Sequence, residues 1–530
     1  MRVLIIGLDG ATWDVLDDFL LDHHMPNLKK LKTEGYSGIL RSTDPPVTPA
    51  AWTTFITGCQ PYTHGVLGFK DYSFKDDRLS ISSSASCLVP TMWEELSRQG
   101  YKVASINVPW TYPCRKVNGF VVAGYGVPDT QVRFTYPADF KNELLANIPD
   151  YKVLANWEQG DDYSREQFDE NVSRMERCFE QRIETVKIIN DKLSWDVLMV
   201  QFQDVDLVQH HVWPYLDKNT RDNYSFERDR LFIAFKKLDE AVGSLLKLAD
   251  DNQSAVVVVS DHGFGKMLGS IRANMLLYKW GYLKFKSSVN RMFRRLHRNL
   301  KPILDTEDGS VPIEIKTPVD WKRSKAMVMY AAMNGHVYLN VKGRNPYGTV
   351  ERGSQYDEII EDLREKFSRV THPVTGEKMF SRVLTPAELY NADFDKVEKL
   401  GDLILVATPG YIVHQSTTRK GDPVKLQPEN SLAGCHYWNG IYIINGSGLK
   451  TGRDKPAHIV DLAPTIYAML GAKLPAYLDG KVMHDVFSDR VKVEYLTPQK
   501  SESTGSRHEG LSEKEQMLIH QRLSELGYMD

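Results

Sequence analysis

The sequence predicts an α/β protein with a mostly parallel sheet and helices on both of its faces. Short apolar runs alternate along the chain with stretches of helical periodicity, which is typical of such folds. The run VVVV at residues 256–259 indicates a strand that is covered on both faces, as strands of parallel sheets are. A chain of 530 residues can hold one large α/β domain and a substantial insertion.

The individual elements are predicted from local patterns. The strands are residues 3–8, 103–106, 119–123, 197–201, 256–260, 403–407 and 440–444. Helical periodicity covers residues 164–190, 226–249 and 458–471. A shorter helix is predicted from a capping box of Thr91 and Glu94 and from Gly100 at its end.

Residues 266–420 differ in composition from the rest of the chain. They contain a basic stretch, a segment rich in proline and threonine at residues 302–320, and short β-like pieces near residues 326–341. We therefore expect residues 266–420 to be an inserted α+β cap in a discontinuous core of residues 1–265 and 421–488. Residues 489–530 are predicted to form a linker and a C-terminal helix.

The overall composition narrows the class of protein. A net charge of −3 gives no support for binding nucleic acid through bulk charge, and no run approaches the roughly 18 apolar residues of a membrane span. Five dispersed cysteines without a C-x-x-C spacing favour reduced thiols. The apolar start of the chain, MRVLIIGLDG, is too short for a signal peptide, so we expect a buried strand and a cytoplasmic protein.

Two residues near the N-terminus are candidates for chemistry. Asp9 follows the first predicted strand and precedes a glycine turn, without the G-x-G-x-x-G pattern of dinucleotide binding. Thr48 precedes Pro49 and a helix-compatible run, which predicts an N-cap position at the positive end of a helix dipole. Taken alone, Thr48 is more typical of an ordinary helix cap than of a nucleophile.

A second pair of candidates follows the predicted strand at residues 197–201. Asp206 and His210 are four residues apart, so one helical turn places both side chains on one face. Asp204 and His211 are their neighbours with less suitable spacing, and we expect them to surround the ligands rather than to be ligands.

The remaining candidates are Asp261, His262 and His436. Asp261 and His262 follow a buried strand and enter a glycine-rich turn, and His436 lies just before the last predicted strand. Because the carboxyl ends of parallel strands meet at one edge of a sheet, these side chains are expected to lie together. Aspartates, histidines and one hydroxyl in this arrangement indicate two-metal phosphate chemistry.

The order of these motifs resembles the alkaline phosphatase superfamily. The motifs are Asp9, T-P-A-A-W-T-T-F-I-T-G at residues 48–58, P-Y-T-H-G at 61–65, D-x-x-x-H at 206–210, D-H-G at 261–263 and G-x-H at 434–436. Within the superfamily, the type I phosphodiesterase/nucleotide pyrophosphatase branch is the most similar. The resemblance covers roughly residues 1–265 and 400–488, and NGHVYLNVKGRNPYGTV at 334–350 looks like the cap of predicted phosphohydrolases in this group.

The resemblance implies an alkaline-phosphatase-like fold and a role for each candidate. One divalent metal ion would be held by Asp206, His210 and His436. A second would be held by Asp9, Asp261 and His262, with the Thr48 oxygen as an additional ligand.

The same resemblance implies a mechanism. Thr48 would attack phosphorus and form a phosphothreonine intermediate. A mixed set of aspartate and histidine ligands suits zinc best, with manganese as the alternative.

The segment that begins at Thr48 differs from the corresponding motif in three groups of related enzymes. Nucleotide pyrophosphatases of this branch carry an asparagine three residues after the nucleophile, where this chain has Ala51. Sulfatases need a modifiable cysteine or serine, which T-P-A-A lacks, and cofactor-independent phosphoglycerate mutases use serine.

Three functions stay open at this point. The leading hypothesis is a phosphodiesterase or pyrophosphatase acting on a small phosphorylated substrate: a nucleotide, a sugar or a lipid-linked phosphate. A phosphomonoesterase or phosphomutase on the same site, and a non-catalytic binding protein with this fold, are the alternatives.

Two segments are candidates for substrate specificity. Tyr437 and Trp438 flank His436 and could bind a base or sugar by stacking. Residues 289–301 combine apolar and arginine positions at helical spacing. Two interpretations of this segment are open: a solvated helix of the cap, or a helix that contacts an anionic substrate or a membrane surface.

Overall fold

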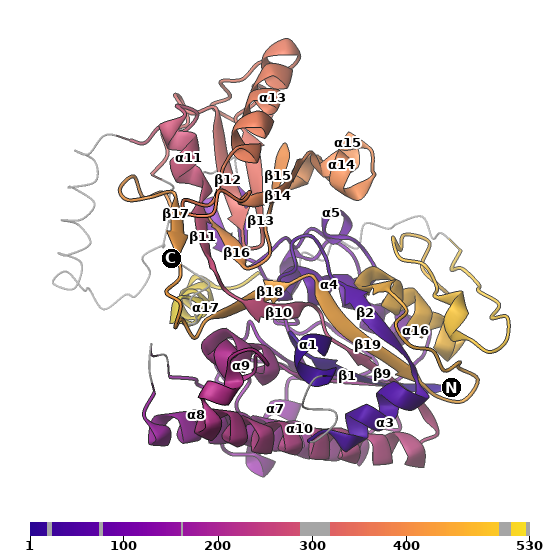
Figure 1. Ribbon diagram of the computed structural model, residues 1–530. Helices are drawn as coiled ribbons and strands as arrows, with labels where there is room; N and C mark the ends of the chain where they lie inside the picture. The colour runs from indigo at the N-terminus through magenta and orange to yellow at the C-terminus, as the bar shows by residue number, and fades with distance from the viewer. Residues whose placement is uncertain are drawn as a thin grey trace, which may run out of the picture. The chain divides into compact units, whose positions relative to one another are not determined.

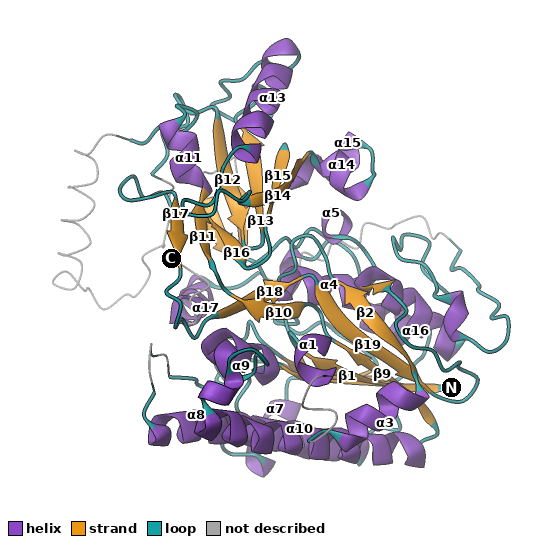
Figure 2. Cartoon of the chain, viewed as in Figure 1, coloured by secondary structure: helices purple, strands orange, loops and turns teal. Residues whose placement is uncertain are grey.

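The computed structural model describes residues 1–17, 24–73, 78–158, 160, 163–286, 318–497 and 510–525 (Figures 1 and 2). The chain forms two compact units. Unit 1 comprises Met1–Phe69, Ser82–Leu268 and Gln427–Gly510, and unit 2 comprises Lys70–Ile81, Gly269–Leu426 and Leu511–Asp530. The basic segment at residues 289–301 lies outside the described residues, and the function of residues 266–420 as a cap stays a prediction.

Unit 1 is built on a nine-stranded sheet in the order β20-β2-β19-β9-β1-β8-β5-β6-β7. The strands are β1 (Arg2–Leu8), β2 (Tyr36–Arg41), β5 (Val103–Val108), β6 (Gly119–Ala123), β7 (Thr135–Tyr136), β8 (Val197–Phe202), β9 (Ser254–Val259), β19 (Asn439–Asn445) and β20 (Ala457–His458). The five neighbours β9, β1, β8, β5 and β6 run parallel, so their carboxyl ends share one edge. The predicted mostly parallel sheet is confirmed.

Helices cover both faces of this sheet, as Figure 1 shows. On one face, α8 (Arg165–Asn190) and α10 (Ser225–Asp251) pack against each other and against the central strands, with α3 (Pro26–Glu34) beside α10. On the other face lie α4 (Thr48–Thr57), α6 (Met92–Arg98) and α16 (Leu462–Leu470). No helix among the described residues is long and apolar enough to cross a membrane.

The alternation of side chains along the strands explains this layering. Val3 and Ile5 of β1 belong to a buried cluster with Trp52 and Phe55 of α4 and Ile466 of α16. The intervening residues of β1 are also fully buried and point to the opposite face, because side chains of a strand alternate. A strand that is buried on both faces is mostly apolar along its length, and for this reason the continuous apolar runs in the sequence indicated the central strands.

Most elements agree with their predicted positions, and the differences concern strand pairing. The predicted strand at 440–444 is β19, which runs antiparallel to both β9 and β2. The predicted strand at 403–407 is β15 (Leu403–Ala407), which belongs to unit 2. The strand β2, between the first helices, was not predicted. The capping box of Thr91 and Glu94 is present at the start of α6.

Unit 2 has its own core around an antiparallel sheet in the order β12-β13-β15-β14. Its strands are β12 (Ala326–Ala331), β13 (Asn334–Leu339), β14 (Phe380–Leu384) and β15, and α13 (Ser354–Ser368) packs on β14 and β15. Further elements are β3 (Lys70–Ser73), β4 (Arg78–Ile81), β11 (Gly269–Arg272), β16 (Tyr411–His414), β17 (Val424–Leu426), α11 (Ala273–Lys279), α14 (Pro386–Tyr390), α15 (Phe394–Val397) and α17 (Glu513–Glu525).

A short antiparallel pair extends unit 1 beyond the carboxyl edge of its sheet. It consists of β10 (Gly263–Lys266) and β18 (Gly434–Tyr437). The first residue of β10 passes close to the backbone of β19. A Cβ atom on Gly263 would lie 2.0 Å from the Asn439 carbonyl oxygen. Only a glycine fits here, because the clashing atom belongs to the backbone and cannot rotate away.

We expect Gly263→Ala to destabilise unit 1 by about 3 kcal/mol or more, which is the upper range for overpacking a close contact. Thermal unfolding should show a melting temperature lower by several degrees. Gly68→Ala is the matched control, because a Cβ atom on Gly68 would meet no atom within 4 Å. Equal melting temperatures for the two variants would contradict the close approach of β10 to β19.

Candidate metal centre and nucleophile

The predicted site residues of unit 1 come together at the carboxyl edge of the parallel strands. Asp9 follows β1, and α9 (Asp204–Val212) follows β8 after one residue. Asp261 and His262 lie between β9 and β10. His436 lies on β18, and β19, which runs antiparallel to β9, begins three residues later at this same edge. The topology of the sheet therefore brings four segments that are distant in the sequence together at one edge.

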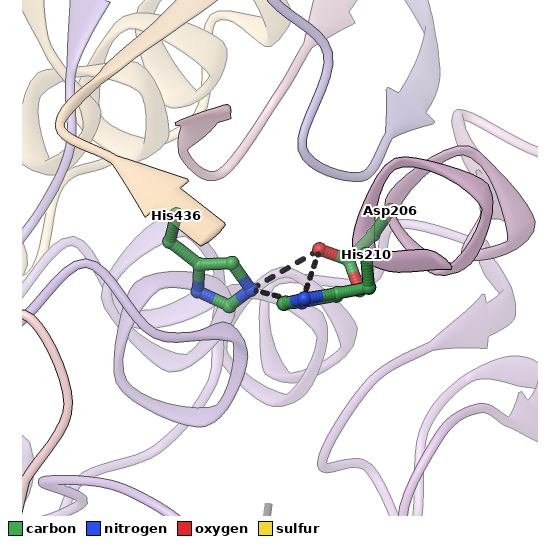
Figure 3. A group of neighbouring side chains, drawn as sticks. All are labelled: Asp206, His210 and His436. Carbon is green, nitrogen blue, oxygen red and sulfur yellow. Dashed lines mark hydrogen bonds and ion pairs between the residues drawn. The ribbon is translucent and has the colours of Figure 1, made fainter. Parts of the chain in front are cut away.

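Asp206, His210 and His436 form the first group (Figure 3). The four-residue spacing on α9 brings His210 Nε2 to 3.5 Å from Asp206 Oδ1. His436 Nε2 lies 3.2 Å from the same Asp206 oxygen and 2.8 Å from His210 Nε2. Three ligand atoms thus face a common point, in the way that ligands of a divalent metal ion do.

Asp9, Asp261 and His262 form the second group, and all three are fully buried. His262 Nε2 lies 3.6 Å from Asp9 Oδ1 and 3.3 Å from Asp261 Oδ2. Asp9 Oδ1, Asp261 Oδ2 and His262 Nε2 have no hydrogen-bond partner among the described residues. Buried polar atoms without partners are rare, and three of them facing one another fit a cation.

The two groups are direct neighbours. His262 Nε2 of the second group lies 3.9 Å from Asp206 Oδ1 of the first. The rings of His262 and His436 are stacked, with their centroids 3.7 Å apart. Two-metal hydrolases hold their ions roughly 4 Å apart, so the contact of the two groups meets that requirement.

Backbone carbonyls fix the tautomers of the histidines. His262 Nδ1 lies 3.1 Å from the Gly263 carbonyl oxygen and His436 Nδ1 lies 3.0 Å from that of Pro46. His210 makes a similar hydrogen bond to the backbone of Gly434. A ring nitrogen that faces a carbonyl must carry the proton, so Nε2 of a neutral ring keeps its lone pair for a ligand. Burial lowers the pKa of His210 and His262, which favours these neutral rings.

The three carboxylates differ in their electrostatic surroundings. Burial, followed by the charges of Asp261 and Asp206, raises the pKa of Asp9 well above its usual value. Burial and the charge of Asp206 do the same to Asp261. For Asp206, burial is outweighed by the imidazoles of His210, His436 and His262, which hold its pKa below the usual value. Crowding of buried carboxylates is the condition that a bound cation relieves.

Thr48 is the first residue of α4, and the N-cap residue is Val47. The predicted N-cap position was therefore wrong by one residue. The first backbone hydrogen bond of the helix runs from the Ala51 N–H to the Val47 carbonyl at 2.9 Å. The hydroxyl of Thr48 is buried and has no hydrogen-bond partner among the described residues. A threonine that capped the helix would use this hydroxyl on the backbone.

The loop before Thr48 is hydrogen-bonded to the segments that carry the candidate ligands. The Ser42 hydroxyl donates to the Asp261 carbonyl oxygen at 2.6 Å, and His436 is bonded to Pro46. Trp438 Nε1 donates to Asp44 Oδ1 at 2.6 Å. One short segment, His436–Trp438, thus provides a candidate ligand and also holds the loop that leads to the candidate nucleophile, Thr48.

The remaining candidates have structural partners in unit 1. The Trp438 ring is buried and bonded to Asp44, and the Tyr437 ring covers Gly265. Asp204 Oδ1 accepts from the Ala155 N–H at 2.7 Å, and the ring of His211 stacks on Trp157. Substrate binding by Tyr437 and Trp438 stays a prediction.

Sequence reasoning missed two neighbours of Asp9. Trp52 Nε1 and Gln201 Nε2 both donate to Asp9 Oδ2, at 2.6 and 2.7 Å. The signals were available: Trp52 lies one helical turn after Thr48, and Gln201 is a polar residue inside an otherwise apolar strand. A buried amide in a central strand needs a partner, and here the partner is a candidate ligand.

Comparison with known proteins identifies the family. The family described as type I phosphodiesterase / nucleotide pyrophosphatase matches residues 3–439 of the chain. None of the curated protein sequences matches significantly.

Two solved structures show a similar fold. Phosphonoacetate hydrolase from Sinorhizobium meliloti 1021, in complex with phosphonoformate, is 16% identical with a TM-score of 0.56, covering 89% of this chain and 95% of that chain. Human ectonucleotide pyrophosphatase / phosphodiesterase 5 is 14% identical with a TM-score of 0.51, covering 92% of this chain and 100% of that chain.

The family match spans most of the sequence and includes every candidate metal ligand. It also confirms the resemblance that the motifs indicated. The chain therefore belongs to the type I phosphodiesterase/nucleotide pyrophosphatase family of the alkaline phosphatase superfamily, and it is a hydrolase of phosphoric esters.

Proposed function

We propose that this enzyme is a metal-dependent phosphodiesterase or pyrophosphatase with Thr48 as its nucleophile. The observation that carries the proposal is the position of α4 between the two ligand groups. Pro46, two residues before Thr48, is bonded to His436 of the first group. Trp52, one turn after Thr48, is bonded to Asp9 of the second. Residues four apart share a helix face, so Thr48 faces the same side as the Trp52 ring.

The side chains fit two divalent metal ions. Three carboxylates and a threonine alkoxide would balance the charge of two such ions. Imidazole and carboxylate together suit zinc best, with manganese as the alternative. When bound, the ions would supply Lewis-acid stabilisation of the charge that develops on the nucleophile and on the phosphoryl oxygens.

The residues of the chain would carry out two displacements. Thr48 Oγ1 gives up its proton and forms a bond to phosphorus while the bond to the ester or phosphate leaving group breaks. The leaving group takes up a proton, and a phosphothreonine remains. Attack of water on phosphorus then breaks the bond to Thr48 and restores the hydroxyl. The helix start assists both steps, because the N–H groups of Thr48 and Ala50 have no acceptor within the helix.

The substrate we propose is a small organic phosphodiester or pyrophosphate. Ala51 stands where nucleotide pyrophosphatases of this branch carry an asparagine, so the backbone N–H groups of the helix start would take over its donation to a phosphate oxygen. Diesters carry one negative charge and monoesters two. The chain has no arginine or lysine between Thr48 and Lys70, which favours the diester.

We expect faster turnover of bis-(p-nitrophenyl) phosphate than of p-nitrophenyl phosphate, and a loss of at least about 10³-fold in kcat for Thr48→Ala. The matched control is Thr53→Ala on the same helix. The Thr53 hydroxyl is buried and donates to the Pro49 carbonyl at 2.6 Å, away from the ligands. Full activity of the Thr48→Ala variant would refute the assignment of Thr48 as the nucleophile. Faster turnover of the monoester than of the diester would favour the phosphomonoesterase alternative.

We also expect the enzyme to bind two divalent ions per chain, measured by elemental analysis, and to lose activity after treatment with a chelator. Asp206→Asn and Asp261→Asn should each lower the metal content. Asp239→Asn is the control, because Asp239 is equally buried but accepts from the backbone N–H groups of Asn27 and Leu28. Undiminished activity in a metal-free protein would contradict the two-metal proposal.

A further inference from the structure

Among the described residues, the hydrogen bonds to the Asp9 carboxylate fall on one of its two oxygens. Oδ2 accepts from Trp52 Nε1 at 2.6 Å and from Gln201 Nε2 at 2.7 Å. Oδ1 has no hydrogen-bond partner among the described residues and lies 3.6 Å from His262 Nε2. We propose that Trp52 and Gln201 are positioning residues that fix Asp9 so that Oδ1 alone serves as a ligand. The inference rests on the proposed metal-dependent function.

The chemistry of the two donors supports a fixed orientation. An indole N–H can only donate and an ionised carboxylate can only accept, so Trp52 has to be the donor and Asp9 the acceptor in this hydrogen bond. The Gln201 amide is oriented for the same reason: its nitrogen, which can donate, must face the carboxylate. That nitrogen also lies 3.1 Å from Gln203 Oε1, which is an acceptor as well. Both donors are neutral, so they hold Oδ2 without cancelling the charge that a cation requires.

The donors themselves are held rigidly. Trp52 and Gln201 are fully buried. The Trp52 ring packs edge-on against Phe55, with centroids 5.7 Å apart. Gln201 lies in the middle of the sheet, where its strand β8 pairs with β1 on one side and β5 on the other. A carboxylate fastened to two such groups cannot rotate to offer both oxygens.

The backbone of β1 leaves space for this arrangement. A Cβ atom on Gly7 would lie 2.9 Å from Gln201 Cγ and 2.9 Å from Trp52 Cη2. Gly7 pairs with Gln201 in the sheet and lies two residues before Asp9, on the same face. The absence of a side chain at this position therefore lets both donors reach Oδ2.

The arrangement also couples the nucleophile to the ligand. Trp52 and Thr48 lie one turn apart on α4. A shift of the helix would thus move the Thr48 hydroxyl and the Asp9 carboxylate together. Groups that hold a ligand in place typically contribute a factor of about 10–100 to metal affinity.

The test compares Trp52→Phe with Trp93→Phe. Both tryptophans are buried in the same apolar cluster, and Trp93 Nε1 has no hydrogen-bond partner among the described residues. Each substitution removes the same atoms, but only Trp52→Phe removes a bond to Asp9. Zinc affinity is measured with a chromophoric competitor. The visible spectrum of the cobalt-substituted protein reports ligand geometry independently of activity.

We expect Trp52→Phe to weaken binding of one of the two zinc ions about 10–100-fold and to alter the cobalt spectrum, with Trp93→Phe like the wild type. Equal zinc affinity and equal spectra for both variants would overturn the inference. A wild-type protein that binds no zinc or cobalt would instead overturn the proposed function on which it rests.

Gln201→Met serves as a second variant if Trp52→Phe does not fold. It keeps the shape of the side chain and removes the other donor. Weakened binding of one zinc ion in this variant supports the inference, and unchanged affinity overturns it.

Discussion

Three aspartates lie buried beside one another in this enzyme, and much of unit 1 is arranged around that fact. Burying one ionised carboxylate without compensation is unfavourable, and adjacent ones repel. The protein surrounds Asp9, Asp206 and Asp261 with imidazoles and neutral donors. Under the proposed function a cation would balance this charge excess, together with the histidines whose lone pairs are directed inward at the same edge of the sheet.

The position of the candidate nucleophile, Thr48, depends on the same arrangement. The loop from β2 to α4 is bonded to the strands at Asp261, His436 and Trp438, and the helix is bonded to Asp9 through Trp52. Both sides of Thr48 are therefore fixed to the ligand groups. If Thr48 acts as proposed, a hydroxyl held in this way would need little reorganisation for the attack, and positioning of this kind is a main source of catalytic power in phosphoryl transfer.

The fold class and the gathering of the candidate residues could be predicted from the sequence because both follow from periodicity. Continuous apolar runs such as VVVV at 256–259 identified the parallel strands, and the polar residues after them had to meet at one edge. The direction of β19 was not predictable, since an apolar run looks the same in either direction. Trp52 and Gln201 were missed because their role depends on a contact between distant segments. The exact start of α4 depends on which of two adjacent residues first adopts helical angles, and sequence patterns rarely decide that.

The separation of His436 from the other candidate ligands in the sequence has a consequence for biosynthesis. Asp9, Asp206, Asp261 and His262 have all been synthesised before most of unit 2, whereas His436 and β19 follow it in the chain. β19 lies between β2 and β9, so the central sheet remains open until residue 445 has left the ribosome. At roughly 5–20 residues per second, the interval after His262 is on the order of 10–30 s. During that interval the nascent chain holds the second group of candidate ligands but lacks His436 of the first, so under the proposed function the complete centre would form only late in translation.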